Sequence, residues 1–82
     1  MYYVYIIKSE RNGRYYTGST ENVDRRLIEH NSSDTKSTRY LKPFVLVYFE
    51  KHETRAKALL RERYLKTGKG REERDRLIES LN

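Results

Sequence analysis

The dipeptide Asn12-Gly13 is the feature that most constrains the fold, because it stands between two runs rich in tyrosine and β-branched residues. Both of its residues tolerate the positive φ angles of a two-residue type I′ turn, so the pattern is a strong short-range signal of a β-hairpin. We predict strands over residues 2–8 and 14–18. With a loop of only two residues, Ser9 opposes Tyr16.

Five of the eight tyrosines lie in this hairpin. The two-residue period of a strand places Tyr5, Ile7, Ser9 and Tyr16 on one face, with Tyr5 and Tyr16 about 13 Å apart along the strands. The sequence therefore predicts a shared face and no contact between the two phenols. The alternative interpretation, more common for such residues, is that they are amphipathic strand residues with hydroxyls at the water boundary.

The length and composition predict one small domain over residues 1–82. The chain has no cysteine, which suits a reducing compartment. It has no apolar run of the roughly 18 residues that span a bilayer and no secretory signal, so we expect a cytoplasmic protein without a membrane partner. The net charge of +6 favours a polyanionic partner, although Lys and Arg also serve solubility.

A first helix is predicted over residues 23–30, with Asn22 as its N-cap. Val23, Arg26, Leu27 and His30 share one face of this helix, so a guanidinium and an imidazole accompany two apolar residues. Two interpretations remain equal at this point. Arg26 and His30 form part of a site, or Arg26 extends its stem along the core with its head in water and His30 lies at the boundary.

Residues 31–43 are polar and predict a loop whose hydroxyls and cations suit phosphate contacts, with an ordinary solvated loop as the alternative. Residues 44–50 predict a strand with apolar side chains on both faces. Such a strand is usually central in its sheet or covered on both sides.

A second helix is predicted from its cap Thr54 to about Lys66. Glu62 lies beside the apolar stripe of this helix and is either an exposed ion-pair partner or a partly buried oxygen ligand. The stripe and its adjoining side are formed by Ala56, Leu59, Leu60 and Tyr64, and by Ala58, Glu62 and Leu65, respectively.

Gly68-Lys69-Gly70 is predicted to end the second helix, because glycine commonly terminates helices. It is not a nucleotide-binding loop, since it lacks the first glycine and the final hydroxyl of that motif. A third, highly charged helix is predicted over residues 71–81, with Leu77, Ile78 and Leu81 as its apolar seam.

Two triplets and their downstream residues form a recognisable pattern. Tyr3-Val4-Tyr5 is followed after ten residues by Tyr16-Thr17-Gly18, then by Arg26 and His30 on one helix and Glu62 on the next. In this combination the chain resembles the GIY-YIG nuclease superfamily over nearly its whole length, and in particular its small single-domain bacterial members.

The resemblance implies an α+β fold, a three-stranded antiparallel sheet flanked by about three helices, and hydrolysis of phosphodiesters that depends on one Mg²⁺ or Mn²⁺ ion. It implies that Tyr5, Tyr16, Arg26 and His30 are catalytic and that Glu62 binds the metal. We expect Tyr5 to act as base or proton relay. Because a phenol is scarcely ionised at neutral pH, we expect His30, whose ordinary pKa lies nearer neutrality, to assist it. Tyr16 is then expected to position water or phosphate.

The chain departs from the family pattern at three places. Tyr3 replaces a glycine, Thr17 replaces an isoleucine, and residues 66–70 lack the asparagine that many larger relatives carry after the metal-ligand helix.

Larger relatives take their target choice from attached domains. For this chain we therefore expect low sequence specificity on DNA, with RNA as the alternative, in DNA repair or processing. Nucleic-acid shape or a protein partner would supply the choice of site. The residues expected to contact phosphates are Lys36, Arg39, Arg55 and Arg63. The competing interpretation is a non-catalytic nucleic-acid-binding module acting as a subunit of a repair assembly.

Overall fold

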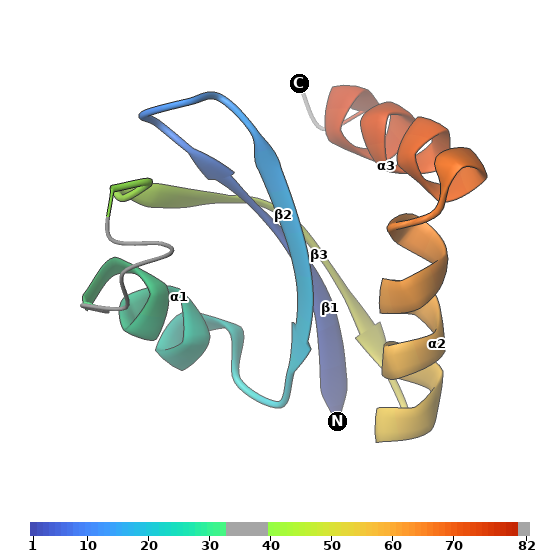
Figure 1. The fold of residues 1–82 in the computed structure, drawn as a ribbon. Coiled ribbons are helices and arrows are strands. Elements are labelled where there is room, and N and C mark those ends of the chain that lie inside the picture. Colours follow the sequence, from blue (N-terminus) through green and yellow to red (C-terminus); the bar gives the residue numbers. More distant parts are fainter. Residues whose placement is uncertain (33–39, 81–82) are drawn as a thin grey trace.

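The fold is a three-stranded antiparallel sheet between helices, described by a computed structural model for residues 1–32 and 40–80 (Figure 1). The chain order is β1 (Tyr2–Ser9), β2 (Tyr15–Thr20), α1 (Val23–Ser32), β3 (Phe44–His52), α2 (Arg55–Leu65) and α3 (Gly68–Ser80). The strands are ordered β2-β1-β3, with α1 on one side of the sheet and α2 and α3 on the other. The predicted α+β architecture is confirmed.

Strand β1 is the centre of the protein, because it pairs with both other strands and is buried on both faces. On the side of α2, Val4 packs with Ala58 and Leu65. On the side of α1, a second cluster is built from Tyr5, Ile7 and Phe44, with Tyr16, Val23, Leu27, Leu41 and Leu46 packed against it. Each face of one strand thus organises its own small core.

The hairpin forms where predicted, but its register differs by two residues. Tyr16 opposes Ile7 instead of Ser9, and the loop is longer than the two residues expected. Within the hairpin loop only Gly13 takes a positive φ, of 72°, whereas a type I′ turn needs two such residues. The Gly13 N–H donates to the Ser9 carbonyl at 2.9 Å, and the Ser9 hydroxyl accepts from the Arg11 N–H at 3.1 Å, so Ser9 stabilises the wider loop.

A shift of two residues leaves every side chain on its predicted face. Tyr5 and Tyr16 therefore share the α1 face as expected. Their separation along the strands falls from four residues to two, or roughly 7 Å.

The predicted N-caps of α1 and α2 are confirmed. The Asn22 side chain accepts from the Arg25 N–H at 3.0 Å, and the Thr54 hydroxyl accepts from the Lys57 N–H at 3.2 Å. Among the helices in the described parts of the chain, none has the length and apolarity needed to cross a bilayer.

The buried face of α2 is the side next to the predicted stripe. Ala58 and Leu65 are buried, whereas Leu60 is 66% exposed and Tyr64 is also exposed. The small Ala58 packs against Val4 of the central strand. The helix is accordingly rotated so that Arg61 and Glu62, rather than Leu60 and Tyr64, lie near the sheet, where both find polar partners.

The glycine pair after α2 does not end that helix as predicted, because both glycines belong to the first turn of α3 and neither has a positive φ. Gly70 is buried, and a Cβ there would overlap the Tyr64 carbonyl group and lie 2.7 Å from Leu65 Cα. The glycine is needed for the close approach of α3 to the end of α2. The Thr67 hydroxyl accepts from the Gly70 N–H at 3.1 Å and caps the new helix.

Strand β3 lies at an edge of the sheet, so it is not central, but helices pack against both of its faces.

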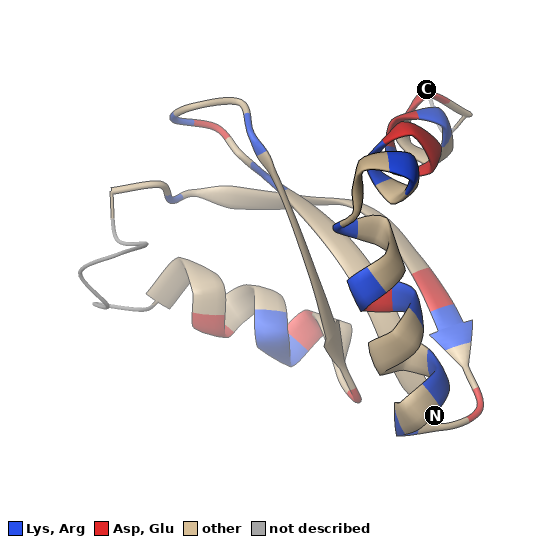
Figure 2. Ribbon diagram, turned by 45° about the vertical axis from the view of Figure 1, so that its right-hand side comes forward, with Lys and Arg blue, Asp and Glu red and all other residues tan. Residues whose placement is uncertain are grey.

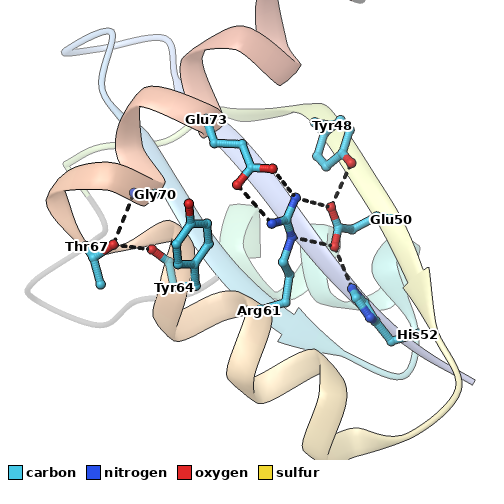
Figure 3. A network of polar contacts seen from close by, with 8 residues as sticks. All are labelled: Tyr48, Glu50, His52, Arg61, Tyr64, Thr67, Gly70 and Glu73. Carbon is cyan, nitrogen blue, oxygen red and sulfur yellow. Dashed lines mark hydrogen bonds and ion pairs between the residues drawn. The ribbon is translucent and has the colours of Figure 1, made fainter.

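A polar network ties this edge to α2 and α3 (Figure 3). The Arg61 guanidinium donates to both oxygens of Glu50 on β3 and both oxygens of Glu73 on α3, at 2.9–3.3 Å. Glu50 also accepts from the Tyr48 hydroxyl at 2.7 Å and contacts His52.

The network shifts the acidity of its members. Burial and the hydrogen bond to Glu50 raise the pKa of Tyr48 to about 12. Burial alone would raise the pKa of Glu50, but hydrogen bonds from Arg61, Tyr48 and His52 outweigh it and lower the pKa. Glu50 is therefore ionised at neutral pH and balances Arg61.

Candidate active site

A hydrogen bond joins strand β1, which carries the first triplet, to helix α1, which covers this face of the sheet. The Tyr5 hydroxyl of β1 lies 3.0 Å from His30 Nε2 of α1, and the two rings meet edge to face with centroids 5.9 Å apart. Tyr5 opposes Gly18 on β2, and a Cβ at Gly18 would overlap the Tyr5 hydroxyl and lie 2.6 Å from its Cζ. The glycine of the second triplet thus provides the space in which the Tyr5 ring lies.

His30 is held in its neutral form. Burial lowers its pKa below the ordinary value, the nearby Arg26 charge lowers it further, and the charge of Glu29 opposes them. A neutral imidazole protonated at Nδ1 can accept the Tyr5 proton at Nε2. The ring also contacts Phe44 at 5.7 Å, and the Asn31 side chain fixes Phe44 by bonding both its N–H and its carbonyl, at 2.6 and 3.1 Å.

Arg26 lies one helical turn before His30 and is the third member of this group. The interaction with the nearby Tyr5 hydroxyl is the main cause of a raised pKa at Arg26, and partial burial opposes it. The guanidinium also pairs with Glu29 at 3.4 Å, and its side chain remains 45% exposed. Arg26 therefore lies near Tyr5 and is also open to solvent, where it can receive a phosphate.

Tyr16 shares this face but not the hydrogen bond. The rings of Tyr16 and Phe44 meet edge to face with centroids 5.7 Å apart, and the Phe44 ring also contacts His30. Its hydroxyl accepts from the Asn12 side-chain amide of the hairpin loop at 3.2 Å. The structure thus links Tyr16 to the Tyr5–His30 pair through Phe44.

Glu62 lies on the other face of the sheet. Its Oε1 accepts from the Ser19 hydroxyl at 2.6 Å, and its Oε2 accepts from Lys66 at 2.8 Å. Ser19 opposes Val4, so it faces α2, whereas Gly18 opposes Tyr5 and faces α1. The structure therefore brings Tyr5, His30 and Arg26 together and places Glu62 apart from them.

The two groups meet at the edge strand. Gly18 and Ser19 are consecutive residues of β2, one of the two edge strands, and α1 and α2 lie on either side of it (Figure 1). A ligand lying across β2 at this dipeptide would have Tyr5 and its partners on one side and Glu62 on the other.

Glu62 is suited to hold one hard cation. Burial would raise its pKa, but hydrogen bonds from Lys66 and Ser19 and the charges of Lys66 and Arg63 lower it, so the carboxylate is ionised. In the described residues no three His, Cys, Asp or Glu side chains cluster as a metal site. A carboxylate with water and phosphate oxygens is a set that Mg²⁺ accepts. The ion would compete with Lys66 for Oε2.

The residues predicted to bind phosphate are spread over the molecule. Arg55 lines a hollow of about 270 Å³ together with Ser19 and Glu21, near Glu62. Arg63 is exposed on α2, close enough for its charge to act on Glu62. Lys36 and Arg39 lie outside the described residues. Lys and Arg residues recur along α2 (Figure 2).

Four functional neighbours were not identified from the sequence. Lys66 follows Glu62 by four residues on a helix, a spacing that itself predicts contact. Ser19 directly follows the second triplet, which could have indicated it. Asn31 and Phe44 meet only through the tertiary fold, and the sequence carries no signal for that contact.

Comparisons with known proteins agree with these features. Residues 1–75 match the sequence family described as "GIY-YIG catalytic domain". A UPF0213 protein of Staphylococcus saprophyticus is 39% identical over 67 residues, which is 80% of either chain. A UPF0213 protein of Haloquadratum walsbyi is 43% identical over 67 residues, 80% of this chain and 74% of the other.

A solved structure supports the fold. The solution NMR structure of a UPF0213 protein from Bacillus halodurans is 34% identical and superposes with a TM-score of 0.56, covering 94% of this chain and 85% of that one. The names of these relatives state no substrate.

Proposed function

Because this chain belongs to the GIY-YIG catalytic-domain family, a family of nucleases, we propose that it is a metal-dependent endonuclease that hydrolyses phosphodiester bonds in DNA. It acts in the cytoplasm, in DNA repair or processing, with low sequence specificity and selection by nucleic-acid structure. The observation that carries the proposal is the Tyr5–His30 hydrogen bond beside Arg26.

The Tyr5–His30 pair provides a path for one proton. Tyr5 passes its hydroxyl proton to His30 Nε2 and takes a proton from the attacking water, which becomes the nucleophile. The Arg26 guanidinium lies close enough to Tyr5 to interact with it electrostatically while the proton moves. His30 is neutral at pH 7, as the acceptor must be.

Arg26 stabilises the phosphate as its negative charge grows. A guanidinium is permanently charged, and a planar fork of N–H donors matches phosphate oxygens. The exposed part of Arg26 next to Tyr5 places this charge where the water would attack.

Glu62 would hold the Mg²⁺ or Mn²⁺ ion, which when bound supplies a Lewis acid for the phosphate oxygens. The Ser19 hydroxyl fixes Oε1 and so leaves Oε2, now bound by Lys66, as the oxygen to be exchanged. Tyr16 orients water or phosphate from its place on Phe44. Contacts to phosphate carry no sequence information, so a protein partner or nucleic-acid shape would select the target.

The test is cleavage of end-labelled single-stranded, duplex and branched DNA and matching RNA, with and without Mg²⁺ or Mn²⁺. Folded Arg26→Ala and Glu62→Ala are expected to lose metal-dependent cutting. The matched controls are Arg25→Ala, the exposed neighbour on α1, and Glu72→Ala on α3.

Equal activity in Arg25→Ala and Arg26→Ala would remove the catalytic assignment. Wild-type protein that binds these nucleic acids in a salt-sensitive way but cuts none of them would support the non-catalytic binding module instead.

A further inference from the structure

A second cleft, larger than the hollow at Arg55, lies on the face of β2 opposite to Tyr5. It has a volume of about 680 Å³. Strand β2 and the hairpin form one wall, and the end of α2 and the first half of α3 form the other. The lining residues are Gly13, Arg14, Tyr15, Tyr16, Thr17, Leu65, Lys66, Arg71 and Arg74.

The lining of this basic cleft contains four cations and no carboxylate. Arg14 and Arg71 are exposed, and within the described part of the chain no acidic side chain pairs with either. Arg74 lies over the Tyr15 ring at 5.4 Å, which fixes its guanidinium at the cleft, although it also pairs with Asp75 at 3.0 Å. Arg14 and Arg71 therefore bring uncompensated positive charge to the cleft, whereas Lys66 and Arg74 also pair with Glu62 and Asp75.

The basic cleft begins at the candidate metal ligand. Lys66 lines it and also bonds Glu62. On the other wall, Thr17 lines the cleft and stands two residues before Ser19, the other partner of Glu62, on the same face of β2. A chain of phosphates leaving Glu62 along β2 would pass Lys66 and Thr17 and then reach Arg71, Arg74 and Arg14.

We propose that this basic cleft binds the phosphodiester backbone of one nucleic-acid strand, on one side of the phosphate that is cut at Glu62. The proposal rests on the proposed function, since it takes Glu62 as the point of cleavage. It adds the direction in which the substrate strand runs, along β2 towards the hairpin loop.

The chemistry of the cleft indicates backbone contacts and not base contacts. Its donors are guanidinium, ammonium and hydroxyl groups, which suit phosphate oxygens. The Tyr15 ring carries Arg74, and Lys8 lies over it at 5.8 Å, so its faces serve cations and are not a platform for bases. Binding in the cleft is therefore independent of sequence and depends on salt.

The experiment measures binding without any metal. The affinity for a labelled single-stranded DNA of mixed sequence is followed by fluorescence anisotropy in EDTA at several salt concentrations. The test variant is Arg14→Gln with Arg71→Gln, because both side chains are exposed and their loss leaves packing intact. The control is Lys51→Gln with Arg76→Gln, which removes the same charge from exposed positions outside the cleft.

Each lost phosphate contact on a single strand lowers the slope of log K against log salt by about 0.7, so the test variant should lose about 1.4 and bind more weakly. The control variant should keep the wild-type slope. Equal slopes in the two variants would overturn the proposal. Polyglutamate that competes with DNA as well as unlabelled DNA does would also overturn it, since the cleft would then accept any polyanion.

Cleavage is scored separately with wild type and Glu62→Gln. If wild type cuts nothing while the cleft variant alone loses affinity, the proposed nuclease fails and the cleft stands as a binding site. If Glu62→Gln abolishes cutting but both double variants bind alike, the nuclease stands and the cleft assignment fails.

Discussion

The Tyr5 hydroxyl is hydrogen-bonded to His30 Nε2 at 3.0 Å and so joins the central strand to a residue of α1 that is 25 positions further along the chain. Because burial and the charge of Arg26 lower the pKa of His30, the imidazole is a proton acceptor at neutral pH. This pair connects the first triplet to the residues that follow the second, and most of the chemistry proposed for the chain depends on its protonation state.

The first prediction concerns pH. Since the pKa of His30 is lowered from 6.5, the imidazole takes up a proton only below that value, and it then no longer accepts from Tyr5. We expect kcat/KM for cleavage to fall as pH drops below about 6.5. His30→Gln should lower the rate by about 10²-fold or more and remove this acid limb. An acid limb that persists in His30→Gln would assign the titration to another group.

Folding stability should also depend on the protonation of His30. The unfolded chain binds a proton at His30 at a higher pH than the folded protein does, so the free energy of unfolding should decrease as pH falls through 6.5 towards the lowered pKa. Urea unfolding at pH 7.5 and 5.5 tests this, and in His30→Gln this contribution to the pH dependence should be absent.

The second prediction concerns the space beside Tyr5. In Gly18→Ala the new Cβ would overlap the end of the Tyr5 ring, which must swing away from His30. A displacement of about 1 Å can reduce a rate about 10²-fold, so cleavage should fall strongly, and moving this buried ring should also cost about 1–3 kcal/mol of stability. The matched control is Gly68→Ala, where a Cβ meets nothing within 4 Å. Full activity in Gly18→Ala would show that the position of Tyr5 is not critical.

The third prediction concerns the junction of α2 and α3. A Cβ at Gly70 would overlap backbone at Tyr64 and Leu65, which cannot move as a side chain can. Gly70→Ala should reduce the free energy of unfolding by about 1–3 kcal/mol. Gly68→Ala, two residues earlier in the same helix, should be neutral or stabilising by up to about 1 kcal/mol. Urea unfolding of the two variants decides the matter, and equal stabilities would contradict the assigned packing.

The fourth prediction concerns Arg61, whose guanidinium balances Glu50 and Glu73 (Figure 3). Arg61→Met leaves two half-buried carboxylates without their main donor and should cost about 1.5–3 kcal/mol of stability. Arg63→Met, at an exposed position two residues later, should change stability by less than about 0.5 kcal/mol. The double variant Arg61→Met with Glu73→Gln should lose less stability than the two single variants lose together. If its loss equals their sum, Arg61 and Glu73 are not coupled.

The sequence predicted the elements well because their signals are local. Caps at Asn22 and Thr54 and the alternation along the hairpin depend on neighbouring residues only. The predicted face of each strand residue was also correct despite the error in loop length, since a shift of two residues leaves every side chain on the same face. The rotation of α2 was missed because it depends on how closely Ala58 approaches Val4, a contact between distant segments.

The candidate site was predictable to the same extent. The helical spacing placed Arg26 and His30 on one face, and the family resemblance added Tyr5; the structure brings these three residues together. The position of Glu62 across the sheet was not predictable, because helical periodicity does not state which face of a sheet the helix covers. The catalytic and metal-binding roles of all these residues remain predictions.

The fifth prediction separates two roles of Lys66. Its ammonium occupies Glu62 Oε2 at 2.8 Å, the oxygen that a divalent ion would need, and it also lines the basic cleft. Lys66→Met should therefore strengthen Mn²⁺ binding, by up to about fivefold for a pair whose lysine is half exposed, while weakening binding to single-stranded DNA. Mn²⁺ titration followed by electron paramagnetic resonance measures the first effect without any turnover, with Glu62→Gln as the baseline and Lys69→Met as the exposed control.

Mn²⁺ affinity that is unchanged in Lys66→Met but lost in Glu62→Gln would mean that the ion binds without displacing Lys66. Affinity that is unchanged in both variants would place the metal elsewhere and leave Glu62 as an ion-pair partner of Lys66.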